Sequence, residues 1–180
     1  MKKESCLICQ IVDGKVPSFK IFEDEKTVAI LDLNGANPGH CFVIPKGHYP
    51  ILEQVPDEEL AQLFLLANKV SVALFDHAGA EGTNIFVANG LPAGQTVAHF
   101  MVHVIPRKQN DGLNLQWQPK QLAEDEASTI ELKLKDELRG SAVTRASTAA
   151  RKPSKPHTAI NSSSWDGDDD EIIMQMRRIP

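Results

Sequence analysis

The chain has 180 residues, 42% hydrophobic and 24% charged, which is enough for one globular domain of ordinary size with an appendage. Its formal net charge of -5 gives no electrostatic reason to expect nucleic-acid binding. No hydrophobic run approaches the roughly 20 residues that span a bilayer, and no hydrophobic segment follows the N-terminal lysines as in a signal peptide.

In the first 140 residues, short hydrophobic segments alternate with turn-forming residues. Strands are predicted at residues 19–22 and 27–31, and the polar residues between them predict a hairpin. Further strands are predicted at residues 41–44, 84–88 and 97–105, the last being the longest alternating segment.

One long helix is predicted to begin at Pro56 or Asp57, where acidic residues suit its positive end, and to run to about Phe75. Its buried stripe is predicted from hydrophobic and small residues at steps of three and four: Leu60, Leu63, Phe64, Ala67, Val70, Ser71 and Leu74. A weaker helix is predicted over residues 123–138. The pattern predicts an α+β domain with a mainly antiparallel sheet.

The composition changes near residue 140. We therefore expect a domain over residues 1–139 and a flexible linker over 140–164, which has almost nothing to bury. Residues 165–180 run from acidic to hydrophobic to basic. This terminal piece is either a peptide that docks on its own chain or on a partner, or a disordered acidic end.

The strand predicted at residues 97–105 carries two histidines. Alternation puts His99, Met101 and His103 on one face and the hydrophobic residues Phe100, Val102 and Val104 on the other, toward the core. Two such histidines can simply be surface residues. The loop before them, residues 89–96, is bracketed by glycines and can turn backbone N–H groups toward an anion, which favours a phosphate site.

Residues 93–107, AGQTVAHFMVHVIPR, resemble the signature block of the histidine-triad (HIT) family. Residues 6–17 resemble the opening of its zinc-containing bacterial and archaeal members, and residues 31–34, 37–40, 43–48 and 81–84 resemble further family motifs in the same order. The resemblance implies the HIT fold, a five-stranded antiparallel sheet with helices. It also implies a homodimer in which two sheets become continuous.

The resemblance implies that His99, Met101 and His103 stand at the first, middle and third positions of the triad. In the family the middle histidine attacks the α-phosphate of a nucleotide, and the third hydrogen-bonds the phosphate or leaving group. A thioether attacks phosphorus poorly, and losing a nucleophile costs on the order of 10⁴–10⁶ in turnover. Ala88 also replaces an amide of the family, unless Asn89 substitutes for it, and two such departures favour natural divergence over an engineered knockout.

The resemblance further implies a nucleoside cleft. Asp32 is the candidate acceptor for ribose hydroxyls, although it can equally cap a turn. His40 either lies on the surface or lines the cleft. The other candidate ligand-binding residues are Phe22, Ile30 and Leu31 for the hydrophobic walls, and Gln95, Thr96 and His103 for the phosphate or another polar group. Met101 at the nucleophile position and Asn89 as a substitute for the lost amide complete the set.

Cys6 and Cys9 form C-x-x-C, a spacing that lets both thiolates reach one metal ion, although a redox pair or two buried thiols look the same. The resemblance supplies His48 and His99 as further ligands and so predicts a structural zinc site. Cys41 is then an ordinary core thiol. An odd number of cysteines argues against a disulfide framework and predicts a cytoplasmic protein.

Three functions remain open. The first is a ligand-binding protein that keeps a nucleotide-sized cleft without the hydrolysis. The second is an enzyme with altered chemistry that uses His103 or His40 as acid or base. The third is an interaction module regulated by its terminal peptide, whose acidic residues 166–171 can mimic phosphate near Lys46 or Arg107.

Overall fold

The computed structural model of the protein describes residues 5–140. The linker predicted over residues 140–164 lies, apart from Gly140, outside the described residues, as does the terminal peptide predicted over 165–180. The chain divides into two units, one ending at Trp117 and the other beginning at Gln118. The sheet belongs to the first unit, and the second contains α3 (Glu124–Gly140), close to the helix predicted over 123–138.

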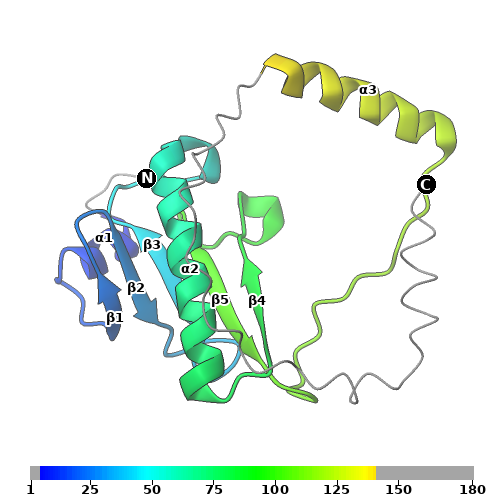
Figure 1. Cartoon of the computed structure of the whole chain (residues 1–180). Helices are drawn as coiled ribbons and strands as arrows, with labels where there is room; N and C mark the ends of the chain where they lie inside the picture. Colours follow the sequence, from blue (N-terminus) through cyan, green and yellow to red (C-terminus); the bar gives the residue numbers. More distant parts are fainter. Residues whose placement is uncertain (1–4, 141–180) are drawn as a thin grey trace, which may run out of the picture. The chain divides into compact units, whose positions relative to one another are not determined.

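The first unit is built on a five-stranded sheet in the order β1-β2-β3-β5-β4, in which all neighbouring strands are antiparallel (Figure 1). This confirms the α+β class and the antiparallel sheet. The predicted hairpin is also present, closed by Asp24, whose carboxylate accepts hydrogen bonds from the N–H groups of Lys26 and Thr27 at 2.9 and 2.6 Å. The strands are β1 (Lys20–Glu23), β2 (Thr27–Leu31), β3 (Cys41–Pro45), β4 (Gly82–Phe86) and β5 (Val102–Arg107).

Two strand predictions need correction. β5 begins at Val102, so the predicted strand over 97–105 was wrong for its first five residues. The imidazole of His99 explains the late start. Its Nε2 donates to the carbonyl of Pro45 at 3.0 Å, at the end of β3 where the backbone of a longer β5 would have to pair with β3. β4 begins at Gly82, two residues earlier than predicted, and ends at Phe86.

The long helix α2 (Asp57–Ala78) begins where predicted and continues three residues beyond Phe75. It ends at Gly79, whose φ of 64° is in the left-handed region that glycine adopts without strain. Four of the predicted stripe residues are buried and Leu60 and Ser71 are half-buried. Phe64 is 41% exposed, and Leu66, which was not predicted, is buried.

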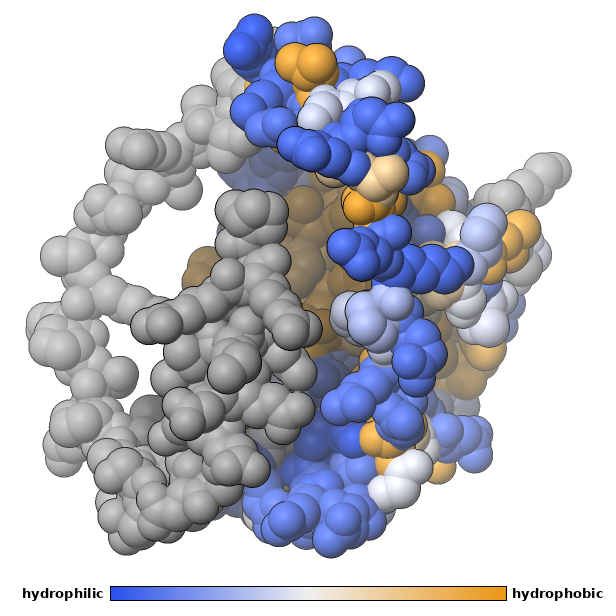
Figure 2. All heavy atoms as spheres, turned by 90° about the vertical axis from the view of Figure 1, so that its right-hand side faces the viewer, coloured by the Kyte–Doolittle hydropathy of each residue, from blue (hydrophilic) through white to orange (hydrophobic). Residues whose placement is uncertain are grey.

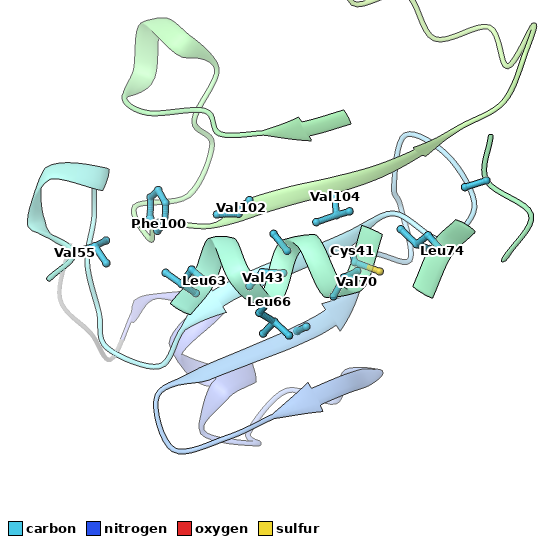
Figure 3. Close-up of a cluster of buried hydrophobic side chains, with 13 residues drawn as sticks. Cys41, Val43, Val55, Leu63, Leu66, Val70, Leu74, Phe100, Val102 and Val104 are labelled. Atoms are coloured by element: carbon cyan, nitrogen blue, oxygen red, sulfur yellow. The ribbon is translucent and has the colours of Figure 1, made fainter. Parts of the chain in front are cut away.

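One hydrophobic core lies between α2 and the sheet. Figure 3 shows Leu63 and Val70 of α2 near Val43 of β3 and Val102 and Val104 of β5, all of which are buried. Phe100 and Cys41 belong to the same cluster, as the alternation around the histidines and the assignment of Cys41 to the core predicted. α2 therefore covers one face of the sheet (Figure 1).

A second core contains the other side chains of the same strands. Val28, Ile30 and Ile44 pack with Cys6, Ile8 and Cys9 at the N-terminus, where the short helix α1 (Leu7–Val12) forms. Because side chains alternate along β2 and β3, this cluster lies on the face opposite α2. α1 was not predicted, since six residues are too few to show a helical period.

The surface carries hydrophobic side chains in several places. On the face shown in Figure 2, hydrophilic side chains cover most of the coloured surface, and hydrophobic ones lie between them. Exposed hydrophobic residues include Leu65 and Phe75 on α2 and Ile85 on β4. Within residues 5–140, no helix is both long and hydrophobic enough to cross a membrane.

Candidate metal centre and ligand cleft

Cys6, Cys9, His48 and His99 come together at the start of α1. Their ligand atoms all lie within 4.8 Å of one another, and three of the four residues are buried. Cys6 is the residue before α1, and Cys9 follows one turn later, so both thiols point to the same place. None of the three cysteines is in a disulfide. The predicted ligand set is thus assembled in one cluster.

The distances in this cluster suit a tetrahedral ion. Cys9 Sγ lies 3.2 Å from His48 Nδ1 and 3.5 Å from His99 Nδ1, and Cys6 Sγ lies 3.6 Å from His99 Nδ1. A tetrahedral zinc ion with its usual bond lengths holds sulfur and nitrogen ligands about 3.5 Å apart. The four residues can therefore hold a metal ion with little movement.

His99 is held in the orientation that a metal ligand needs. Its Nε2 lies 3.0 Å from the carbonyl oxygen of Pro45, and because a carbonyl only accepts, Nε2 carries the proton. The lone pair of Nδ1 then faces the sulfurs of Cys6 and Cys9. Burial lowers the pKa of His99, which keeps the ring neutral and ready to bind a metal.

A cleft of about 380 Å³ lies beside this cluster, and His99 lines both. Its walls come from α1 and the loop after it, from β2 and β3, and from the segment before β5. The predicted ligand-binding residues that line it are Ile30, Leu31, Asp32, Gln95, Thr96, Met101 and His103.

Two predicted ligand-binding residues lie outside the lining. Phe22 is on β1 and is 42% exposed. The side chain of Asn89 accepts a hydrogen bond from the N–H of Leu52 and donates one to Glu53, both at 2.9 Å. Asn89 thereby anchors its loop, and Ala88 lines the cleft instead.

The loop from Gly90 to Gln95 uses its polar groups within itself. The N–H groups of Ala93 and Gln95 donate to the carbonyl of Gly90, and that of Gly94 donates to Leu91. The side chain of Gln95 accepts from the N–H of Gly90 and donates to the carbonyls of Pro50 and Val97. The expectation that this loop turns N–H groups toward an anion is therefore wrong for Gly90, Ala93, Gly94 and Gln95.

His40 and His103 form a hydrogen-bonded pair at the cleft. The N–H of Ala36 donates to His40 Nδ1 at 3.1 Å, so the proton of His40 is on Nε2, which lies 3.2 Å from His103 Nδ1. His103 in turn carries its own proton on Nε2. His40 is buried and lies behind His103, so it is neither on the surface nor in the cleft lining.

Burial keeps both rings of this pair neutral. It lowers the pKa of His40, partly opposed by Asp32, whose carboxylate lies 3.6 Å from His40 Nδ1. Burial, reinforced by His40, lowers the pKa of His103 to about 4. Asp32 also accepts a hydrogen bond from the N–H of Asn34 at 2.9 Å. It therefore caps a turn, one of its two predicted roles, and also lines the cleft. Its role as acceptor for ribose hydroxyls stays a prediction.

Several lining residues were missed by the sequence analysis. Phe42 and Phe86 place their rings edge-on against His103, with centroids 4.9 and 5.7 Å away. Phe42 lies on β3 two residues after His40, which directly precedes the strand, so alternation could have placed the two side chains on the same side. The wall made by α1 and the loop after it, with Leu7, Ile8, Ile11, Pro17 and Phe19, gave no such signal.

The HIT domain family matches residues 13–110 of the chain, which include the sheet, α2 and His103. The chain belongs to the HIT family. An uncharacterized HIT-like protein of Methanocaldococcus jannaschii is 41% identical over 107 residues, which are 59% of this chain and 82% of that protein. An adenosine 5′-monophosphoramidase of Candida albicans is 34% identical over 139 residues, 74% of this chain and 91% of that enzyme.

Solved HIT structures share the fold. The crystal structure of a HIT-family protein from Bacillus subtilis has a TM-score of 0.71 at 33% identity, covering 76% of this chain and 99% of that one. A Zn-bound histidine triad family protein from Mycobacterium smegmatis has a TM-score of 0.60 at 32% identity, covering 78% of this chain and 100% of that one. The five-stranded antiparallel HIT sheet predicted from the sequence is thus confirmed.

Proposed function

We propose that this HIT protein binds zinc at Cys6, Cys9, His48 and His99 and a nucleoside or nucleotide in the adjacent cleft, without forming a nucleotidyl-histidine intermediate. One observation carries the proposal: Met101 and His103 line the same cleft. In the proposed alignment Met101 takes the place of the nucleophilic histidine. A thioether has no transferable proton and is a poor nucleophile toward phosphorus, so the covalent step is lost.

The proposed zinc ion has a structural role. Two thiolates and two imidazoles are a usual zinc donor set, and four protein ligands leave no position for water or substrate. When bound, the ion supplies folding free energy by joining the N-terminus to the segments that carry His48 and His99. The Zn-bound Mycobacterium smegmatis relative supports this assignment.

The proposed ligand follows from the cleft walls. Ile30 and Leu31 offer hydrophobic contact to a base, and Asp32 offers carboxylate oxygens to ribose hydroxyls. His103 Nε2–H is a donor for a further polar group. The similarity to an adenosine 5′-monophosphoramidase supports an adenine nucleoside or nucleotide as the first ligand to test.

A second candidate function is an enzyme with altered chemistry. The His40–His103 hydrogen bond of 3.2 Å favours it, because it occupies His103 Nδ1 and leaves the N–H at Nε2 as a proton donor for a substrate in the cleft. In that case His103 is the acid or base and Met101 is only a neighbour of the substrate.

We also propose a cytoplasmic homodimer with a continuous sheet. The edge strand β4, with exposed Ile85, and the exposed Leu65 and Phe75 of α2 support such an interface. Buried cysteines outside disulfides suit a reducing compartment. Docking of the terminal peptide stays a prediction, since its residues are outside those described.

The experiment measures metal content, binding and turnover on one preparation of the full chain. Metal analysis should give about one zinc per chain. Isothermal titration should show binding of adenosine, AMP or GMP, while adenosine phosphoramidate should not be hydrolysed at a rate above background. Rapid hydrolysis would favour the second candidate, and failure of every nucleoside and nucleotide to bind would overturn the proposed ligand.

A further inference from the structure

The end of the cleft around His103 is mostly nonpolar. The side chains that line it there are the methyl group of Ala88, the thioether of Met101 and the rings of Phe42 and Phe86. The two rings contact His103 edge-on. Of the predicted phosphate-binding side chains that line the cleft, only the His103 imidazole and the Thr96 hydroxyl keep a donor for an anion, because the Gln95 amide is used within its loop. A phosphate placed here would lose its hydration against hydrocarbon and sulfur, which is costly unless donors replace the water.

Several N–H donors of the neighbouring loop, which could otherwise replace the lost water around a phosphate, already donate within the protein. The N–H groups of Gly90, Ala93, Gly94 and Gln95 all donate within the loop. Both hydrogen-bonding positions of the Gln95 side-chain nitrogen are also taken, by the carbonyls of Pro50 and Val97 at 2.6 and 2.8 Å. These N–H groups stabilise the loop, and they would have to give up their present hydrogen bonds before they could bind an anion.

The charge in the cleft also disfavours a bound phosphate. Asp32 is the one lining residue, among those the structure describes, with a formal charge at neutral pH. Its neighbour His40 is neutral there, because burial lowers its pKa, and His103 is neutral for the same reason. A phosphate dianion would therefore meet a carboxylate and neutral rings, whereas an uncharged ligand meets no repulsion.

We propose that the cleft selects uncharged nucleosides over their 5′-monophosphates. The ribose hydroxyls bind Asp32, the base packs against Ile30 and Leu31, and the nonpolar end holds a 5′-hydroxyl that accepts from the N–H at His103 Nε2. This inference rests on the proposed nucleoside cleft and narrows its ligand class.

Isothermal titration of the zinc-loaded full chain with adenosine and with AMP at pH 7.5 tests the inference. Adenosine should bind at least about tenfold more tightly than AMP, a difference of about 1.4 kcal/mol. Equal or tighter binding of AMP would overturn the preference while leaving the proposed nucleoside cleft intact. Binding of neither would remove the proposed cleft itself, and the preference with it.

A pair of variants tests the cause. Ala88→Asn adds an amide donor at the nonpolar end and should tighten AMP several-fold relative to adenosine. Ala88→Leu, of similar size but without a donor, should give no gain for AMP. An equal effect of the two variants on AMP would show that shape rather than missing donors sets the preference. Zinc content and circular dichroism establish that each variant is folded. If a variant does not fold, the comparison of adenosine with AMP on the wild-type protein decides the inference by itself.

Discussion

His103 lies between the rings of Phe42 and Phe86 and bonds to His40, and these contacts fix its protonation. We expect its imidazole to titrate near the pKa of about 4 that burial and His40 impose. The proton resonances of the ring, followed by NMR from pH 8 to pH 3.5 and assigned with His103→Asn, measure this directly. A midpoint near the ordinary value of about 6.5 would contradict the buried arrangement.

The lowered pKa of His103 also makes the free energy of unfolding depend on pH. The folded pKa of His103 is below its unfolded value, so between about pH 6.5 and pH 4 the unfolded chain binds the extra proton. The free energy of unfolding should therefore fall as the pH is lowered through this window and level off below it. Urea denaturation of wild type and His103→Asn over this range isolates the effect, because loss of zinc in acid affects both proteins alike.

Met101 permits a gain-of-function test. If it stands at the nucleophile position, Met101→His should restore slow hydrolysis of adenosine phosphoramidate, in which the new imidazole displaces ammonia from phosphorus and leaves an adenylylated histidine detectable by mass spectrometry. Met101→Leu, which keeps a hydrophobic side chain of similar size, should remain inactive. Restored hydrolysis in both variants would assign the chemistry to another residue.

At the scale of elements, α1 joins the two sites. Cys6 and Cys9 contribute to the metal cluster, while Leu7, Ile8 and Ile11 line the cleft. A helix of six residues is not stable by itself, so its position depends on these contacts. Zinc and ligand are therefore expected to bind cooperatively, each tightening the other by the same factor.

Removing the metal tests this coupling. Dialysis against a chelator should weaken adenosine binding, measured by titration calorimetry, and lower the thermal unfolding temperature. Cys6→Ser should behave like the metal-free protein. Cys41→Ala, which removes another buried thiol from the opposite core, should lower stability without changing ligand affinity in the presence of zinc. Unchanged affinity in metal-free protein would rule out the coupling.

The C-terminus of α2 gives a local prediction of stability. Gly79 has a φ of 64°, so Gly79→Ala should lower the free energy of unfolding by about 1 kcal/mol through backbone strain. Gly82→Ala is the matched control, because its added methyl group would meet Arg107 at an ordinary 3.9 Å without left-handed backbone. Urea denaturation of both variants measures the difference.

The elements differ in how far the sequence predicted them. α2 and α3 show a hydrophobic period over several turns, and the hairpin between β1 and β2 shows its turn residues, so these were found. Residues 97–101 alternate like a strand, yet the His99 side chain bonds where the ladder would continue. Hydrogen bonds of this kind, like the one from the Leu52 N–H to the Asn89 side chain, depend on residues distant in the sequence. A local sequence pattern therefore does not predict them.

At the scale of the whole molecule, the exposed hydrophobic residues of α2 and the edge strand β4 predict self-association. Light scattering should give the mass of a dimer, and Ile85→Lys, which places a charge on the β4 edge, should shift it toward monomer. Leu91→Lys, at a site 84% exposed in the loop before Gly94, should leave the dimer intact. A monomeric wild type would contradict the proposed continuous sheet.

The match to the HIT family begins at residue 13, after Cys6, Cys9 and the whole of α1. A fragment cut at that boundary would keep the sheet and α2 but leave His48 and His99 without their sulfur partners and the cleft without one wall. The sulfur ligands of the proposed zinc site thus come from about a dozen leading residues, whereas its nitrogen ligands come from the domain that the family shares.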